Sequence, residues 1–294
     1  MRAAKPPAYT PLPSLLRCYE IKTFSDNMIQ LILGLLFAAL IAFGAYRAHS
    51  LSRSGAWGAF LEGTIIFGLG GWRWAVLLLT FFITSSVLTH LFTKRKADLS
   101  EKFDKGGQRD LGQVLANGGI ASIFAGLYFF FPQASWTWIG FAASLAAVNA
   151  DTWATEIGVL NPTMPRLLTS WKPVERGTSG GVSLYGTLAA AGGSAVVSVL
   201  AVLFIPPTFL IRTPTILLFL LITLAGLAGS IFDSLLGATV QAIYRCPHCD
   251  KETERHPLHT CGTETVQIRG WKWLNNDLVN TGCAALAAII GMSL

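Results

Sequence analysis

Residues 214–241 read PTILLFLLITLAGLAGSIFDSLLGATVQ. This stretch is apolar over more than the roughly 18 residues that a helix needs to cross a bilayer. Asp233 interrupts its end, although a charge at the bilayer centre costs about 2.5–3.5 kcal/mol. Another apolar run ends in ADTWATEIG at residues 150–158. Acids at the corresponding ends of two spans predict a shared ion or phosphate site.

The composition of the whole chain indicates a membrane protein. Of its 294 residues, 52% are hydrophobic and 13% are charged, and the mean hydropathy is +0.51. Soluble domains carry about 25% charged residues. We therefore predict an all-α fold, a polytopic integral membrane bundle of about seven or eight transmembrane helices. The net charge of +6 does not predict a nucleic-acid partner, because the basic residues lie mainly in connecting loops.

The apolar runs divide the chain into a tail, residues 1–27, and a single transmembrane domain, residues 28–294. We expect spans near residues 28–46, 56–71, 73–92, 111–131, 135–155, 180–205, 214–241 and 273–293. Most Lys and Arg follow the odd-numbered spans, which predicts that these loops are cytoplasmic or stromal. The polar motifs then share that face. Both a bacterial plasma membrane and a plastid envelope fit this topology, and the oligomeric state stays open.

Basic and amide side chains repeat every four residues at the start of the fourth expected span. They are Lys105, Arg109, Gln113 and Asn117. On a helix this spacing forms one stripe, with two cations at the water boundary and two amides deeper. Such a stripe suits an anion that reaches toward the membrane. Snorkelling cations and interhelical hydrogen bonds would produce the same pattern.

A glycine-rich turn precedes the sixth expected span, where residues 176–183 read RGTSGGVS. Backbone N–H groups at such a turn and the positive end of the next helix favour phosphate. The alternative is a capped tight turn followed by close helix packing. The candidate phosphate-binding residues are Arg176, Gly177, Thr178, Ser179, Gly180 and Gly181.

The acids in the spans are candidate ligands of Mg²⁺, which is typically held by one or two carboxylates plus phosphate oxygens and water. Asp151 and Asp233 are the primary candidates. Glu156 lies off the Asp151 face and is the weaker one, because it can instead pair with a neighbouring cation. At the start of the last span, Asn276, Asp277 and Asn280 are further candidates for substrate binding, with helix capping as the alternative for Asp277.

The loop at residues 242–272 contains a cysteine and histidine cluster that resembles half of a zinc ribbon. A tetrahedral structural zinc site needs four ligands. Cys246, Cys249 and Cys261 supply three, and His259 is the preferred fourth, with His256 and His248 as alternatives. On the reducing side of a membrane this pattern favours metal binding over a disulfide.

In combination, several motifs resemble the multi-pass membrane family of transmembrane protein nineteen and the plant phytyl-phosphate kinase. These are KGGQRDLGQVLANGG at residues 105–119, ADTWATEIG at 150–158, GTSGGVS at 177–183, DSLLGA at 233–238 and NDLVN at 276–280. The resemblance implies an enzyme that transfers a phosphoryl group from a nucleoside triphosphate, CTP or ATP, to an isoprenyl monophosphate such as phytyl phosphate. A polyprenol kinase, a cytidylyltransferase and a lipid-phosphate carrier or flippase are the alternatives.

The candidate residues suit that chemistry, because phosphoryl transfer requires mainly positioning and charge neutralisation. Asp151 and Asp233 would hold Mg²⁺ as catalytic residues, and Lys105, Arg109 and Arg176 would neutralise phosphate charge. The glycine turn would hold one phosphate group, and the apolar tail of the acceptor would lie between spans, within the lipid membrane.

Overall fold

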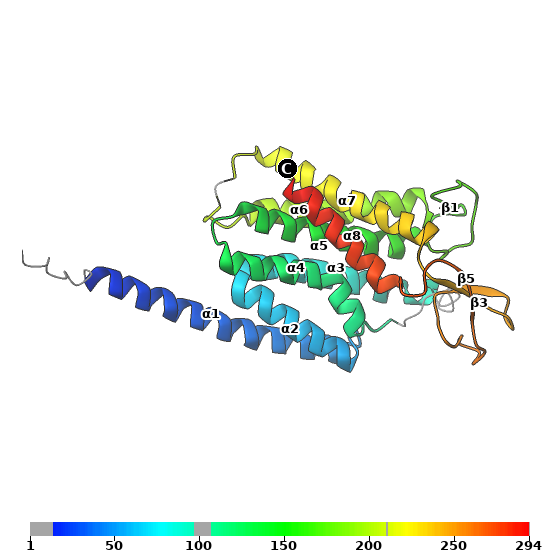
Figure 1. Ribbon diagram of the computed structural model, residues 1–294, viewed down its shortest axis with the longest axis horizontal. Helices are drawn as coiled ribbons and strands as arrows, with labels where there is room; N and C mark the ends of the chain where they lie inside the picture. The colour runs from blue at the N-terminus through cyan, green and yellow to red at the C-terminus, as the bar shows by residue number, and fades with distance from the viewer. Residues whose placement is uncertain (1–13, 97–106, 210, 294) are drawn as a thin grey trace, which may run out of the picture.

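The computed structural model describes residues 14–96, 107–209 and 211–293, with side chains described from residue 28 on and outside 93–96. The described chain is a bundle of helices with two small sheets (Figure 1). The helices are α1 (Ser14–Arg47), α2 (Arg53–Gly70), α3 (Trp72–Lys96), α4 (Leu111–Phe130), α5 (Ser135–Gly158), α6 (Leu184–Leu203), α7 (Thr215–Thr239) and α8 (Asn276–Met292). The all-α class is confirmed.

Fewer of the described helices than predicted have the length and hydropathy of a membrane span. Among the described helices, five are long and apolar enough to cross a bilayer, and α8 is a shorter apolar helix. The five are Met28–Arg47 of α1, Trp72–Phe92 of α3, and the whole of α4, α6 and α7. By this criterion the expected seven or eight spans reduce to five or six. The difference comes from α2, which carries Glu62, and α5, which carries Asn149, Asp151 and Glu156.

Helix α5 can carry Asn149, Asp151 and Glu156 because it lies at the centre of the bundle, where neighbouring helices surround it. It packs against α3, α4, α6, α7 and α8. Most of its residues between 137 and 150 are fully buried, and many of them are alanine or serine, which let neighbouring helices approach closely. Asn149 bonds two of these neighbours: its Nδ2 donates to the Gly193 carbonyl at 2.7 Å, and its Oδ1 accepts from Thr84 Oγ1 at 3.1 Å.

The two sheets lie at the same end of the bundle (Figure 1). Strands β1 (Arg166–Leu167) and β2 (Gly181–Val182) pair antiparallel in the loop between α5 and α6. Strands β3 (Ile243–Cys246), β4 (Lys251–Thr253) and β5 (Val266–Arg269) form an antiparallel sheet between α7 and α8, in the order β4-β3-β5. The ends of α5 and α7 that carry the acids therefore face this polar end of the molecule.

Candidate functional site

A cavity of about 660 Å³ opens at the polar end of the bundle, and nearly all of the sequence-predicted polar residues line it. They come from α4 and the segment just before it, from α5, α7 and α8, and from the loop between α5 and α6. The lining includes Arg109, Gln113, Asn117, Asp151, Glu156, Arg176, Gly177, Thr178, Ser179, Gly180, Gly181, Asp233, Asn276, Asp277 and Asn280. Lys105 lies outside the described residues. Segments far apart in the sequence thus converge on one space.

Three of the carboxylates that line this cavity come from different segments and interact through Asp233. Asp233 on α7 interacts electrostatically with Asp151 on α5 and with Glu254, which follows β4. One oxygen of Asp233, Oδ2, is buried and has no hydrogen-bond partner among the described residues. Like charges brought together at a partly buried position favour a bound cation, and oxygen ligands of this kind are those that Mg²⁺ prefers. The residues present therefore fit a magnesium ion.

Arg109 supplies positive charge on another side of the cavity. Its backbone is fixed, because its N–H donates to the Ser50 carbonyl and its carbonyl accepts from the Ser52 N–H, both at 3.0 Å. Its guanidinium lies over the Phe81 and Phe82 rings. Burial lowers the pKa of Arg109 to about 10 while the nearby Glu156 carboxylate raises it, so the guanidinium stays charged at neutral pH.

Glu156 has an environment of its own beside Arg109. The side chain is buried, and its Oε1 accepts a hydrogen bond of 2.9 Å from Thr89 Oγ1 on α3. Glu156 also interacts electrostatically with Arg109. This arrangement matches the alternative in which Glu156 pairs with a neighbouring cation. Its role as a magnesium ligand stays a prediction.

The amides of the α4 stripe contribute to the helix itself as well as to the cavity. Gln113 forms a capping box with Asp110: the Gln113 N–H donates to Asp110 Oδ1 at 2.9 Å, and Gln113 Oε1 accepts from the Asp110 N–H. Asn117 Nδ2 donates to the Gln113 carbonyl at 2.7 Å. The sequence Asp110-x-x-Gln113 is the signal that identifies this cap. Two of the four stripe residues therefore also stabilise the start of α4.

The glycine turn packs tightly against α7. The N–H of Gly181 donates to the Thr178 carbonyl within the turn, and Gly180 has a φ of +81°. A Cβ at Gly180 would collide with the backbone of Ala238, so glycine is required there by both conformation and space. Helix α6 begins only at Leu184, after the N-cap Ser183, rather than near residue 180 as predicted. The turn therefore packs closely against α7, as in the alternative interpretation, and it also lines the cavity.

Arg176 and the start of α8 complete the rim of the cavity. Arg176 Nη2 donates to the Asn161 carbonyl at 2.8 Å, which stabilises the loop after α5. At α8 the N-cap is Asn275, whose side chain accepts from the Leu278 N–H, and Asp277 lies in the first turn, where a carboxylate complements the helix dipole. Asp277 also lines the cavity, with Asn276 and Asn280.

With this geometry established, comparison with known proteins identifies the family. A family model described as "Integral membrane protein DUF92" matches residues 36–288. The chain belongs to the DUF92 family of integral membrane proteins. The resemblance stated from the sequence motifs is therefore confirmed at the level of family.

Several relatives of this DUF92 protein come from plants and archaea. Protein PGR of Arabidopsis thaliana is 36% identical over 275 residues, 87% of this chain and 93% of that protein. Uncharacterized membrane protein MJ0933 of Methanocaldococcus jannaschii is 32% identical over 219 residues, 74% of this chain and 86% of its own length. Protein VTE6, chloroplastic, of Arabidopsis thaliana is 26% identical over 277 residues, 91% and 69% of the two chains. No solved structure matches.

The DUF92 chain has cavity residues that sequence reasoning missed. Glu254 and Arg255 reach the cavity from the cysteine and histidine loop, and Thr89 reaches it from α3. Gln241, which is buried, joins two walls: its Oε1 accepts from Ser179 Oγ at 2.7 Å, and its Nε2 donates to Glu254 Oε1 at 2.9 Å. Nothing in the local sequence around Glu254 indicates this position, because it depends on how the β3–β5 sheet folds back.

A second, mostly apolar cavity of about 290 Å³ lies between α1, α2, α3 and α4. It shares three lining residues with the polar cavity, namely Arg109, Gln113 and Asn117. Its other walls are almost entirely hydrocarbon, with Glu62 as the exception. The two cavities therefore meet at the predicted anion stripe.

The four preferred zinc ligands of this chain also come together. One ligand atom from each of Cys246, Cys249, His259 and Cys261 lies within 4.8 Å of the others. Hydrogen bonds with Thr263 and His259 lower the pKa of the Cys261 thiol to about 5. The hydrogen bond between Cys249 and Cys261 raises the pKa of the Cys249 thiol to about 11. His248 and His256, the alternative ligands, are not members of this cluster.

Proposed function

We propose that this protein is a membrane kinase that transfers the terminal phosphoryl group of a nucleoside triphosphate to an isoprenyl monophosphate. In the reaction, the bond between the terminal phosphorus and its bridging oxygen breaks. A bond to a phosphate oxygen of the acceptor forms, and the products are an isoprenyl diphosphate and a nucleoside diphosphate. The observation that carries the proposal is that Asp151 and Asp233 line the same cavity as Arg109 and Arg176.

The cavity has both kinds of charge that this reaction needs: carboxylates for a metal ion and arginines for phosphate. Asp151 and Asp233 would hold Mg²⁺, with Glu254 as a third carboxylate nearby. A bound Mg²⁺ supplies charge neutralisation on the phosphate oxygens. Arg109 and Arg176 would bind phosphate oxygens directly, and the turn at residues 177–181 would orient one phosphate group. The acceptor is already a phosphate monoester, so the reaction does not require a strong general base.

The apolar cavity provides a place for the tail of the acceptor. An isoprenyl phosphate has a charged head joined to a long hydrocarbon chain. With its head near Arg109 and Asn117, its chain would enter the cavity between α1 and α4 that shares these residues. Burial of hydrocarbon there contributes about 25 cal/mol per Å². From the distribution of Lys and Arg in the loops, we place the polar cavity on the cytoplasmic or stromal side.

The direct test is to incubate the purified full chain with Mg²⁺, phytyl phosphate and either ATP or CTP. We expect phytyl diphosphate and a nucleoside diphosphate, with one nucleotide preferred. Release of inorganic pyrophosphate together with a cytidylyl-lipid would instead indicate a cytidylyltransferase, and phosphorylation of free phytol would indicate a prenol kinase. Movement of lipid phosphate across vesicles without turnover would overturn the kinase proposal in favour of a carrier.

A further inference from the structure

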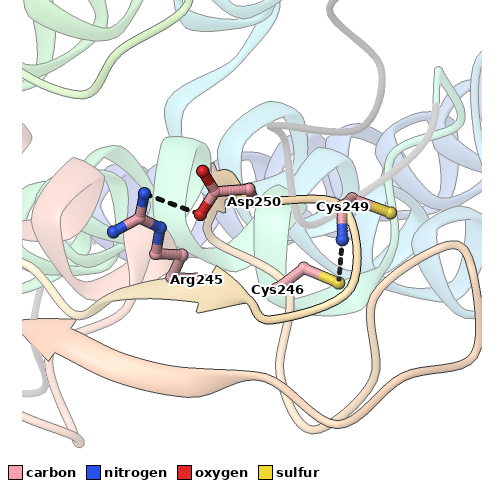
Figure 2. A network of polar contacts seen from close by, with 4 residues as sticks. All are labelled: Arg245, Cys246, Cys249 and Asp250. Carbon is pink, nitrogen blue, oxygen red and sulfur yellow. Dashed lines mark hydrogen bonds and ion pairs between the residues drawn. The ribbon is translucent and has the colours of Figure 1, made fainter.

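Four potential metal ligands lie close together at one end of the sheet between α7 and α8, which we call its tip. Cys246 ends β3, and Cys249 lies in the turn that follows it (Figure 2). His259 and Cys261 come from the long connection between β4 and β5. Cys246 Sγ lies 3.5 Å from Cys261 Sγ, and His259 Nδ1 lies 3.3 Å from Cys261 Sγ. Two strand connections thus meet at one point through sulfur and nitrogen atoms.

These distances fit a metal ion better than a disulfide. The sulfur atoms of a disulfide lie about 2.05 Å apart, and all four cysteines with described side chains are free. Ligands bound at about 2.3 Å in a tetrahedron lie about 3.8 Å from one another, close to the separations found here. The N–H of Cys249 also points at Cys246 Sγ, at 3.5 Å (Figure 2). Three sulfurs and one imidazole are a typical ligand set of structural zinc.

The same loop forms a wall of the polar cavity. Glu254 and Arg255 line the cavity and lie between β4 and His259 in the sequence. Glu254 accepts the hydrogen bond of Gln241, which in turn accepts from Ser179 of the glycine turn. Arg269 on β5 donates to the Gly237 carbonyl at the end of α7, at 2.9 Å. Two separate sets of hydrogen bonds therefore connect the loop between α7 and α8 with the end of α7 and with the turn at residues 177–181.

We propose that Cys246, Cys249, His259 and Cys261 bind one zinc ion, and that this zinc holds Glu254 and Arg255 in the wall of the polar cavity. Hydrogen bonds of Thr265 with the Arg255 and Pro257 carbonyls also hold the connection between β4 and β5, but they do not join it to the β3–β4 turn as a shared ion would. The exposed Arg245–Asp250 ion pair, 2.7 Å across the β3–β4 turn, contributes little because water screens it (Figure 2). Loss of zinc would free residues 251–265 and release Gln241 and the glycine turn, while the helix bundle persists.

The test uses the full chain in detergent with two matched variants. Metal analysis of the wild type should find about one zinc per chain, and Co²⁺ in its place should give the visible absorption of tetrahedral thiolate coordination. Cys261→Ser should lose both signals; Cys261 is exposed, so its replacement is not expected to unfold the bundle. His248→Gln, which changes an exposed histidine adjacent to Cys249, should retain both.

Hydrogen exchange of the same samples tests the link to the cavity and does not depend on kinase activity. In Cys261→Ser, peptides covering residues 176–183 and 251–265 should exchange faster, with α4 and α5 unchanged. Absence of zinc from the wild type, or retention of zinc in Cys261→Ser, would overturn the metal site. Zinc loss with unchanged exchange at residues 176–183 would overturn its link to the cavity.

Discussion

Arg109 belongs to both cavities, and few other residues do. Its backbone is fixed by the turn at Ser50 and Ser52, and its guanidinium is flanked by aromatic rings and by Glu156. Such a cation cannot move far to follow a ligand, so it would set the depth at which a phosphate head is held. The sequence shows Arg109 as one of four similar cations and amides, and its fixed position emerges only from the fold.

We therefore predict that Arg109→Gln raises the KM for the lipid phosphate by roughly 10-fold or more, because a charge-assisted hydrogen bond is worth about 1.5–3 kcal/mol. Arg109→Lys keeps the positive charge but loses the planar guanidinium that can bind two phosphate oxygens at once. Its KM should lie between those of the wild type and Arg109→Gln. Steady-state kinetics with phytyl phosphate measure this effect. Equal KM values in all three proteins would contradict a phosphate-binding role for Arg109.

Among the elements, α5 shows best what the sequence predicts and what it does not. Its position in the chain follows from hydropathy, and the expected span at 135–155 agrees with Ser135–Gly158. Its central position does not follow, because alanine and serine suit both a lipid-facing and a helix-facing surface. The contacts with α3, α4, α6, α7 and α8 explain why Asn149, Asp151 and Glu156 are tolerated there.

Close packing of α7 on α5 can be tested at Gly229. A Cβ at this position would lie 2.7 Å from Ala147 Cβ and 3.0 Å from the Cys283 carbonyl oxygen. Gly229→Ala should therefore destabilise the bundle by about 1–3 kcal/mol through overpacking, and this should lower the thermal unfolding temperature in detergent. Gly126→Ala on α4 is the matched control, since its added Cβ meets nothing within 4 Å apart from the adjacent part of its own helix. Equal unfolding temperatures for the two variants would refute the packing argument.

The loop between α7 and α8 is predicted less completely from the sequence than the helices are. The sequence pattern places Cys246, Cys249, Cys261 and a histidine in one cluster, but it leaves three histidines open, and the fold selects His259. It also gives no sign that Glu254 enters the polar cavity. That position depends on the return of β4 and β5 onto β3 and on the hydrogen bond with Gln241, which are contacts between distant residues.

For the whole molecule, the adjoining cavities predict how tail length affects activity. Ala59→Phe adds a ring to the wall of the apolar cavity between α1, α2, α3 and α4. It should raise the KM for phytyl phosphate several-fold and leave that for the short isopentenyl phosphate unchanged, because both acceptors have the same head. Kinetics with the two acceptors provide the internal control. Equal effects on both would show that the tail binds elsewhere.

Most of the polar cavity could be predicted from the sequence as a set of candidate residues, because acids and glycine turns are unusual in apolar spans. The convergence of α5, α7 and α8 on one space could not, since it depends on which helices pack together. The seven or eight predicted spans exceed the five described helices that are long and apolar enough to cross a bilayer, because α2 and α5 carry polar residues. Hydropathy records how long and how apolar a segment is. It does not show how far neighbouring helices surround a helix such as α2 or α5.

The central claim is that Asp151 and Asp233 act together at one Mg²⁺–phosphate site. The measurement that tests it most directly is the initial rate of phytyl diphosphate formation by Asp151→Asn and Asp233→Asn, beside the wild type and at a series of Mg²⁺ concentrations. We predict that each variant loses at least ~100-fold in rate, requires more Mg²⁺ for its remaining activity, and unfolds at a temperature similar to the wild type. A rate and Mg²⁺ dependence equal to those of the wild type in either variant would contradict the claim.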